Sequence, residues 1–222
     1  MSRDPSLVSY FDISLRASEI ATLQSNCWLN DKIISFAFEY FSRELFKEWK
    51  DKEKVAFLGP DQTQLIKFYA DVGYLKDLLL EPLDLFSKEL IVLPISDGNS
   101  VTDTSGSHWA LLAYFPKKNL FKYADSLYGS CYNIAKQIAG TLQRCFNPSV
   151  LSESVAVESV DCPKQTNSSD CGVYVIAFAE KIAQDYLNLG TTDIKLCSVS
   201  PESVKSKRKE ISGIIDRIKN ER

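Results

Sequence analysis

The residues best suited to chemistry gather around Cys171, in the stretch CPKQTNSSDCGVYVI at positions 162–176. This stretch begins polar and turn-prone, and it becomes apolar from Val173 onward. Asn, Ser and Asp ahead of an apolar segment are typical of a helix start, because their short side chains accept the unpaired N–H groups of the first turn. The pattern therefore predicts a thiol in the first turn of a buried helix, where the partial positive charge favours the nucleophilic thiolate.

The local pattern leaves two interpretations of Cys171 open. Free cysteine is among the most often buried residue types, so a thiol at the head of an apolar helix is commonly only a packing residue. If the thiol is instead a nucleophile, the N–H groups of the helix start are suited to hold a developing oxyanion. Gln165, six residues upstream, is a side chain of the right kind to add another donor.

A thiol nucleophile needs an imidazole as its base, and the chain contains a single histidine, His108. A mechanism of this type therefore uses His108 or does not operate. A lone histidine is by default a surface or hydrogen-bonded interior residue. The position of His108 favours a function, because it stands beside Trp109 where the polar segment 97–107 gives way to a predicted strand. Such junctions on a rigid sheet commonly carry catalytic groups.

An acid that orients the imidazole is predicted at Asp125. Residues 119–126 (NLFKYADS) are predicted to form the second strand of an antiparallel hairpin, entered through a turn at 116–119. A hairpin places the end of its second strand beside the start of its first, so Asp125 and His108 share one edge of the sheet. A carboxylate at that edge fixes the tautomer of the imidazole. The alternative, that Asp125-Ser126 only caps the following turn, fits the spacing equally well.

The chain resembles the ubiquitin-like-protein-specific, or sentrin-type, cysteine proteases, which are distantly similar to the adenovirus protease. The resemblance covers nearly the whole chain and rests on separated motifs in the family's order: Trp28-Leu29-Asn30-Asp31, His108-Trp109, Asp125-Ser126, and Gln165 with Asp170-Cys171-Gly172. The opening DPSLVSYFDISLRASEIATL and the segment LLLEPLDL look closest to the deneddylase branch, which acts on the modifier Nedd. Ala124 and the 97–107 loop depart from the usual pattern, which bears on fine specificity and not on the reaction.

The resemblance implies a papain-like or adenain-like fold and a protease that cleaves after the C-terminal Gly-Gly of a ubiquitin-like modifier. Its substrates would be Nedd precursors and Nedd conjugates, such as modified cullins. It implies no metal and no organic cofactor. The roles it implies are catalysis by Cys171, His108 and Asp125, an oxyanion hole with Gln165, and a narrow tail channel walled by Trp28 and Trp109. The alternative for Trp28 is an anchor for the helix that follows it.

Partner choice requires a broad protein surface, because a short tail cannot distinguish modifiers with similar ends. We expect this surface to include Asp31, Glu81, Asp84, Asp97 and Asn99, and we expect the 97–107 loop to fold over the tail. Two other functions stay open. One is the same chemistry on the small ubiquitin-related modifier or on ubiquitin, and the other is a non-catalytic module that only binds modifiers. The competent residues at all four expected catalytic positions favour an enzyme.

Composition narrows the class of protein. The 222 residues are 45% hydrophobic and 25% charged, which is ordinary for a soluble globular chain. A net charge of −3 argues against a general nucleic-acid binder, and no apolar run approaches a membrane span. The six cysteines include no CxxC pair, which argues against zinc and against a disulfide framework. We expect a monomer in the cytoplasm, the nucleus or both.

Hydrophobic spacing predicts a single α+β domain over residues 1–222, with a central, mostly antiparallel sheet flanked by helices. The N-terminal arm 1–16 is expected to be extended, and the basic run 205–209 in the C-terminal helix is expected to be a solvated face. Helices are predicted at 18–24 (capped by Ser18), 33–46 (started by Asn30 or Asp31), 59–69, 74–80, 130–145, 171–189 (ended by Gly190) and about 200–220 (started by Ser200-Pro201). Strands are predicted at 89–96, 108–115 and 119–125, and a last one is marked by Val155, Val157 and Val160.

Overall fold

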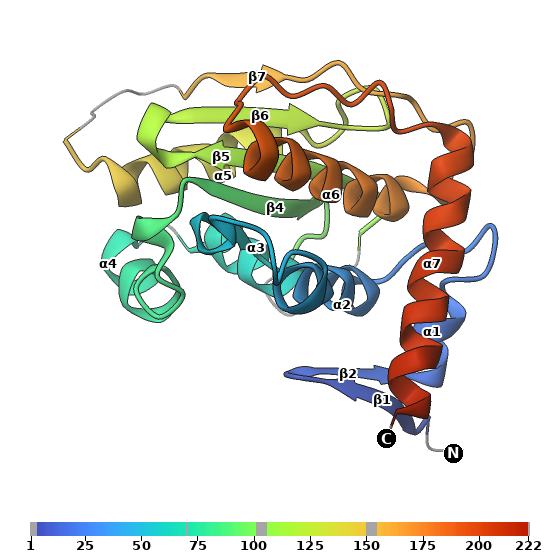
Figure 1. The fold of residues 1–222 in the computed structure, drawn as a ribbon. Helices are drawn as coiled ribbons and strands as arrows, with labels where there is room; N and C mark the ends of the chain where they lie inside the picture. Colours follow the sequence, from blue (N-terminus) through green and yellow to red (C-terminus); the bar gives the residue numbers. More distant parts are fainter. Residues whose placement is uncertain (1–3, 70, 101–105, 150–154, 222) are drawn as a thin grey trace.

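A computed structural model describes residues 4–69, 71–100, 106–149 and 155–221. Within these ranges, a five-stranded sheet in the order β3-β4-β5-β6-β7 lies between two layers of helices (Figure 1). The central strands β4, β5 and β6 pair antiparallel, whereas the short edge strands β3 and β7 pair parallel to β4 and β6. The α+β class is confirmed. The strands are Val55–Phe57 (β3), Leu90–Ser96 (β4), Trp109–Phe115 (β5), Leu120–Ala124 (β6) and Val157–Ser159 (β7).

Both faces of the central strands are buried, which explains their continuous apolar sequences. Every residue of β4 and of β5 is buried. Successive side chains of a strand point to opposite faces, so Leu90 and Val92 join the core on one side while Ile91 and Leu93 join the core on the other. A strand covered on both faces has no polar side and therefore shows no alternation.

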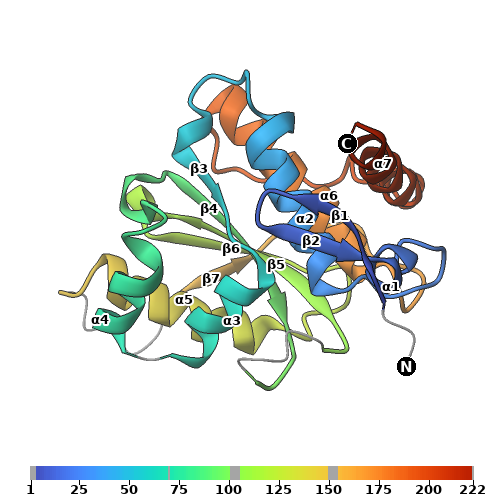
Figure 2. The same cartoon turned by 90° about the horizontal axis from the view of Figure 1, so that it is seen from below.

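The two helical layers cover opposite faces of the sheet, and each forms its own hydrophobic core with it (Figure 2). One core contains buried side chains of α2 (Asp31–Tyr40) and α6 (Cys171–Leu189). The other core contains those of α3 (Pro60–Phe68), α4 (Val72–Leu75) and α5 (Tyr132–Phe146). Both α2 and α4 continue as single π-helical segments, Phe41–Leu45 and Lys76–Leu80. Short 3-10 turns complete the connections at Lys52–Lys54, Leu85–Ser87 and Pro116–Lys118.

Most of the predicted helix ends are confirmed by their capping contacts. The Asn30 side chain accepts the N–H of Ile33 at 3.2 Å, and the Ser200 hydroxyl accepts that of Ser203 at 3.2 Å. Gly190 ends α6 in the left-handed conformation, with φ of 61°. The predicted cap at Ser18 is wrong. The short α1 (Ala17–Ala21) begins after Arg16, because the Glu19 carboxylate accepts the Arg16 N–H at 2.6 Å, while the Ser18 hydroxyl bonds Asp4.

The extended N-terminal arm forms a separate hairpin of β1 (Ser6–Tyr10) and β2 (Ile13–Arg16). The C-terminal helix α7 (Pro201–Asn220) packs against both β1 and α6. Figure 1 shows α7 running from the end of α6 that carries Cys171 toward this hairpin. The C-terminal helix therefore connects the N-terminal hairpin to the helix that carries Cys171. Among the described residues, no helix is long and apolar enough to cross a membrane.

Candidate active site

Cys171 is the first residue of α6, as predicted, and its side chain is buried. The turn before it is held by Asn167, whose side-chain oxygen accepts the N–H groups of Ser169 and Asp170, both at 3.0 Å. The first backbone N–H groups of a helix have no partner within the helix, so they point outward at this end. The thiol therefore lies among donors and at the positive end of the helix dipole.

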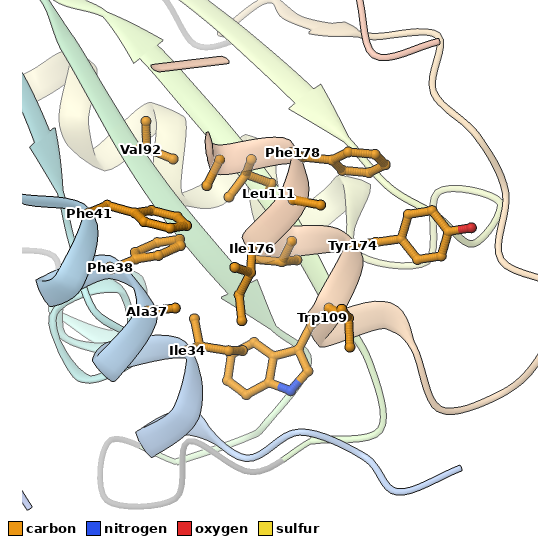
Figure 3. Close-up of a cluster of buried hydrophobic side chains, with 14 of the residues drawn as sticks. Ile34, Ala37, Phe38, Phe41, Val92, Trp109, Leu111, Tyr174, Ile176 and Phe178 are labelled. Atoms are coloured by element: carbon orange, nitrogen blue, oxygen red, sulfur yellow. The ribbon is translucent and has the colours of Figure 1, made fainter. Parts of the chain in front are cut away.

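Gly172 allows α6 to start this close to the neighbouring layer. A Cβ atom at position 172 would lie 2.9 Å from the Cβ of Leu29 and 3.4 Å from Cδ1 of Trp109. Figure 3 shows the Trp109 indole extending from the start of β5 toward Ile34 of α2, beside Ile176 of α6. A larger residue after Cys171 would push the helix start away from β5 and from the segment that carries Trp28.

The antiparallel pairing of β5 with β6 brings His108 and Asp125 together. The register runs from Phe115 opposite Leu120 to Leu111 opposite Ala124, so the start of β5 and the end of β6 share one edge. His108 Nε2 lies 2.7 Å from Asp125 Oδ1, and the two side chains are 5% and 3% exposed. The predicted juxtaposition is confirmed. Asp125 Oδ1 also accepts the N–H of Leu127 at 2.7 Å, so this carboxylate holds the turn as well as the imidazole.

The imidazole lies in an environment that favours its protonated form. Burial alone would lower the pKa of His108, but the Asp125 carboxylate and the nearby Cys171 sulfur outweigh burial and raise that pKa to about 9. Nδ1 of His108 is buried and has no hydrogen-bond partner among the described residues. The Cys171 sulfur is among the groups that raise the pKa of His108, so it lies near the imidazole, and Nδ1 is the nitrogen left to meet it.

Asp97 holds the segment that leads into His108. One carboxylate oxygen accepts the N–H groups of Ser107 (2.6 Å) and His108 (3.1 Å), and the other accepts the Ser107 hydroxyl at 2.5 Å. Burial would raise the pKa of Asp97, yet these hydrogen bonds lower it below its usual value. Gly106 is required here, because a Cβ atom would lie 2.2 Å from an Asp97 oxygen. The described contacts of Asp97 are thus internal, and its role in modifier recognition stays a prediction.

Gln165 lies in the turn before α6 and is held from both sides. Its side-chain oxygen accepts the Ser126 hydroxyl at 2.7 Å, and its amide nitrogen donates to the backbone oxygen of Asn167 at 2.6 Å. Its backbone N–H donates to Ser126 O at 3.0 Å. A side-chain amide has two hydrogens, so one is left after the bond to Asn167. The oxyanion role of Gln165 stays a prediction.

Trp28 and Trp109 line the same small pocket as Cys171. This pocket has a volume of about 170 Å³ and is completed by Leu29, Asn30, Asp31, Gly106 and Ser107. Trp109 is buried, with its indole N–H donating to Leu29 O at 3.1 Å, whereas Trp28 is 49% exposed. The pocket is narrow, aromatic and partly open, which suits a peptide segment whose residues have no side chains. Asp31, predicted for recognition, also reaches this pocket.

The other residues predicted for modifier recognition do not line this pocket. Glu81 follows the π-helical segment after α4 and pairs with Lys76 at 3.3 Å. Asp84 begins the next turn in a left-handed conformation and contacts Ser87. Asn99 is exposed in the loop after β4. That loop is described at its ends only, since residues 101–105 lie outside the described ranges, and the predicted cover over the tail falls partly on them.

Sequence reasoning missed Arg208, and the expectation of a fully solvated basic face at 205–209 is wrong. Arg208 is 6% exposed. Its guanidinium donates to Asp170 Oδ1 at 2.7 and 2.9 Å, and it also donates to backbone oxygens of Ser169 and of the segment before Trp28 (Thr22, Gln24 and Cys27). The buried guanidinium is stabilised by these acceptors, which surround it in the folded chain. The acceptors lie far away in the sequence, so the basic run carries no signal of them.

A thiol at a helix start, beside an imidazole held by a buried carboxylate, is the arrangement of a cysteine peptidase. Residues 27–220 match the family described as "Ulp1 protease family, C-terminal catalytic domain". The chain belongs to this family and is a cysteine-type peptidase.

Relatives of near-equal length agree with this assignment. The chain is 37% identical to human "Sentrin-specific protease 8" over 212 residues, which cover 96% of this chain and 97% of the relative. It is 30% identical to "NEDD8-specific protease 1" of Arabidopsis thaliana over 228 residues, which cover 99% and 96%. These similarities confirm the predicted family and its deneddylase branch.

A solved structure has the same fold. The yeast Ulp1 protease domain, in complex with the SUMO ortholog Smt3, superposes with a TM-score of 0.69 over 98% of this chain and 90% of that chain. Its sequence identity is 22%, so it establishes the architecture alone. The predicted fold is therefore confirmed.

Proposed function

We propose that this chain is a deneddylase, a cysteine protease that cleaves after the C-terminal Gly-Gly of Nedd. The observation that carries the proposal is the pocket that Cys171 lines together with Trp28 and Trp109, next to an imidazole held by Asp125. The near-full-length similarity to proteins named sentrin-specific protease 8 and NEDD8-specific protease 1 supports Nedd as the modifier.

Cys171 is the nucleophile in this proposal. His108 holds the thiol proton, so the sulfur attacks the carbonyl carbon of the modifier's last glycine as a thiolate. The positive helix end and the raised pKa of His108 both favour this ion pair. Asp125 keeps Nε2 of the imidazole occupied, which directs Nδ1 toward the sulfur.

The oxyanion that develops is held by the backbone N–H groups at the start of α6 and by the remaining amide hydrogen of Gln165. A donor of this kind typically contributes about 3 kcal/mol of barrier lowering. His108 then protonates the leaving amine, and the sulfur stays bound to the glycine as a thioester. Water attacks the thioester, which releases the modifier with a free carboxylate and restores the thiol.

The leaving group defines two activities of one site. In a conjugate the leaving amine is a lysine side chain, and in a precursor it is the first residue of the tail peptide. Both substrates place the same Gly-Gly segment between the tryptophans. Nedd-modified cullins are the conjugates we expect, acted on by a monomeric enzyme in the cytoplasm, the nucleus or both.

The small ubiquitin-related modifier and ubiquitin are the alternative substrates on the same chemistry. A rate panel distinguishes them: each modifier is joined through its last glycine to the same fluorogenic amine, and kcat/KM is measured. We expect Nedd to be preferred by at least about a hundredfold, equivalent to roughly 2.7 kcal/mol. A faster reaction with either other modifier would contradict the Nedd assignment.

The same panel separates an enzyme from a binding module. Cys171→Ala is expected to bind Nedd as tightly as the unaltered chain but to release no fluorophore. Turnover that survives this substitution would contradict the role of Cys171. A chain that binds Nedd and shows no turnover even with Cys171 intact would be a binding module.

A further inference from the structure

The second oxygen of the Asp125 carboxylate is held by a tyrosine of β6, the strand that ends just before Asp125. We propose that Tyr123 is a positioning residue of the active site, whose hydroxyl fixes Asp125 and, through it, the imidazole of His108. This inference rests on the proposed catalytic role of Asp125. It adds to the thiol, imidazole and carboxylate a fourth side chain that touches neither substrate nor sulfur.

The hydrogen bonds to Asp125 divide between its two oxygens. Oδ1 accepts from His108 Nε2 and from the Leu127 N–H, both at 2.7 Å, while Oδ2 accepts from the Tyr123 hydroxyl at 2.5 Å. A carboxylate rotates about its Cβ–Cγ bond unless both oxygens are held. The Tyr123 contact therefore fixes the plane of the carboxylate, and that plane sets the direction in which the imidazole bond points.

Burial makes this contact hard to replace. Asp125 and Tyr123 are 4% and 3% exposed, so water has little access to either group. Burial would raise the pKa of Asp125, but the hydrogen bonds from His108, Tyr123 and Leu127 lower it below its usual value. Without the Tyr123 hydroxyl, Oδ2 would be a buried charged oxygen without that donor, which is costly.

The surroundings of Tyr123 direct its proton to Asp125. Its oxygen accepts the N–H of Cys131 at 3.2 Å, just before the start of α5, so its own hydrogen is left for Oδ2. The ring packs edge-on against Tyr132, with the centroids 5.6 Å apart. Burial, followed by the Asp125 contact, raises the pKa of Tyr123 above its ordinary range, so the hydroxyl stays protonated wherever the enzyme works.

The simpler interpretation is that Tyr123 is a core residue whose hydroxyl needs a partner. Tyr114 on β5 provides the matched control, since it is also fully buried and stacks on Phe121 with centroids 4.1 Å apart. Its hydroxyl makes no hydrogen bond within the described ranges. Tyr114→Phe and Tyr123→Phe thus remove the same atom from the same core, but only the second removes a donor from Asp125.

The test measures kcat and KM per titrated active site on the Nedd fluorogenic substrate across pH. Titration normalises for any unfolded fraction. We expect Tyr123→Phe to lower kcat about tenfold, the effect of losing one hydrogen bond to a charged group, with KM unchanged. The acid limb should move to higher pH, because Asp125 loses a bond that favours its ionised form. Tyr114→Phe should change neither quantity.

A double-mutant cycle tests whether Tyr123 acts through Asp125. In an Asp125→Asn background, Tyr123→Phe should cost much less than tenfold, because the carboxylate it positions is gone. An equal cost in both backgrounds would overturn the proposal. So would a Tyr123→Phe enzyme with native kcat and a native pH profile.

A second readout keeps this inference separate from the choice of modifier. The rate at which iodoacetamide alkylates Cys171, followed by peptide mass spectrometry across pH, requires no modifier. We expect the acid limb of this alkylation to move to higher pH in Tyr123→Phe and to stay in place in Tyr114→Phe. A shift together with failure of all modifier substrates would refute the proposed substrate and support Tyr123. No shift would refute the role of Tyr123.

Discussion

The two sides of the active site are held in place by different kinds of contact. The sheet side consists of His108 and Asp125, which are placed by the backbone pairing of β5 with β6. The helix side consists of Cys171, Gln165 and Trp28, which precede or begin helices. Their positions depend on side-chain hydrogen bonds, such as that of Ser126 to Gln165 and that of Arg208 to the backbone of Cys27.

The helix side converges on one cation. Arg208 of α7 binds Asp170, next to Cys171, and the backbone of the segment that ends at Trp28. Asp170 in turn accepts the side-chain amide of Asn167 at 2.8 Å, and Asn167 accepts the amide of Gln165. A backbone ladder tolerates the loss of one side chain, whereas a network that meets at one buried charge does not. The two sides should therefore respond differently to substitution.

The largest effect is expected on the sheet side, from His108→Ala. The chain has no second histidine, so no other imidazole can take the proton of Cys171. We expect turnover of the Nedd substrate to fall by about a thousandfold or more with KM little changed, and we expect a smaller loss of stability than from Arg208→Ala. The strand ladder keeps the backbone in place, and Asp125 loses the His108 bond but keeps its donors Tyr123 and Leu127. Appreciable turnover would contradict the role of His108.

On the helix side, the first effect of a substitution should be a loss of folding stability. Arg208→Ala leaves Asp170 buried without its cation, so we expect the free energy of unfolding to fall by about 3–5 kcal/mol in urea denaturation. Arg217→Ala is the control on the same helix, because the Arg217 guanidinium donates to the Tyr40 hydroxyl at 3.0 Å in a solvent-exposed contact. Equal losses in the two variants would show that Arg208 is not the point where this side is held.

A smaller effect, with a defined direction in pH, is expected from Asp125→Asn. Asp125 contributes to the raised pKa of His108, which is about 9. In the folded enzyme the imidazolium therefore predominates below about pH 9, and it is lost as the pH rises through that value. Without the carboxylate charge, the alkaline limb of kcat should move to lower pH and the rate should fall about tenfold to a hundredfold. An unchanged profile would reassign Asp125 to capping the turn.

The sheet side was predictable because its signals are local. The hairpin needs only two apolar runs and the turn at Pro116–Lys118, and its register then places Asp125 beside His108. The helix starts at Asn30 and Ser200 and the stop at Gly190 were likewise visible as single-residue preferences.

Features that depend on distant partners were not predictable. The edge strand β3 was missed, and β7 was marked without its parallel pairing, because three residues show no period and the partners come from elsewhere in the chain. Arg208 lies in a basic run that looks solvated, although its acceptors include Cys27, 181 residues away. The inward contacts of Asp97 and the Tyr123 bond to Asp125 likewise arise from the folded arrangement of the site.

The central claim is that both sides meet at the sulfur of Cys171. The most direct measurement is to react the chain with Nedd that carries a thiol-reactive group in place of its terminal glycine carboxylate, and to map the adduct by peptide mass spectrometry. We expect one adduct, on Cys171 and on none of the other five cysteines, and its formation should be lost in His108→Ala. An adduct on another cysteine, or equal labelling without His108, would contradict this account.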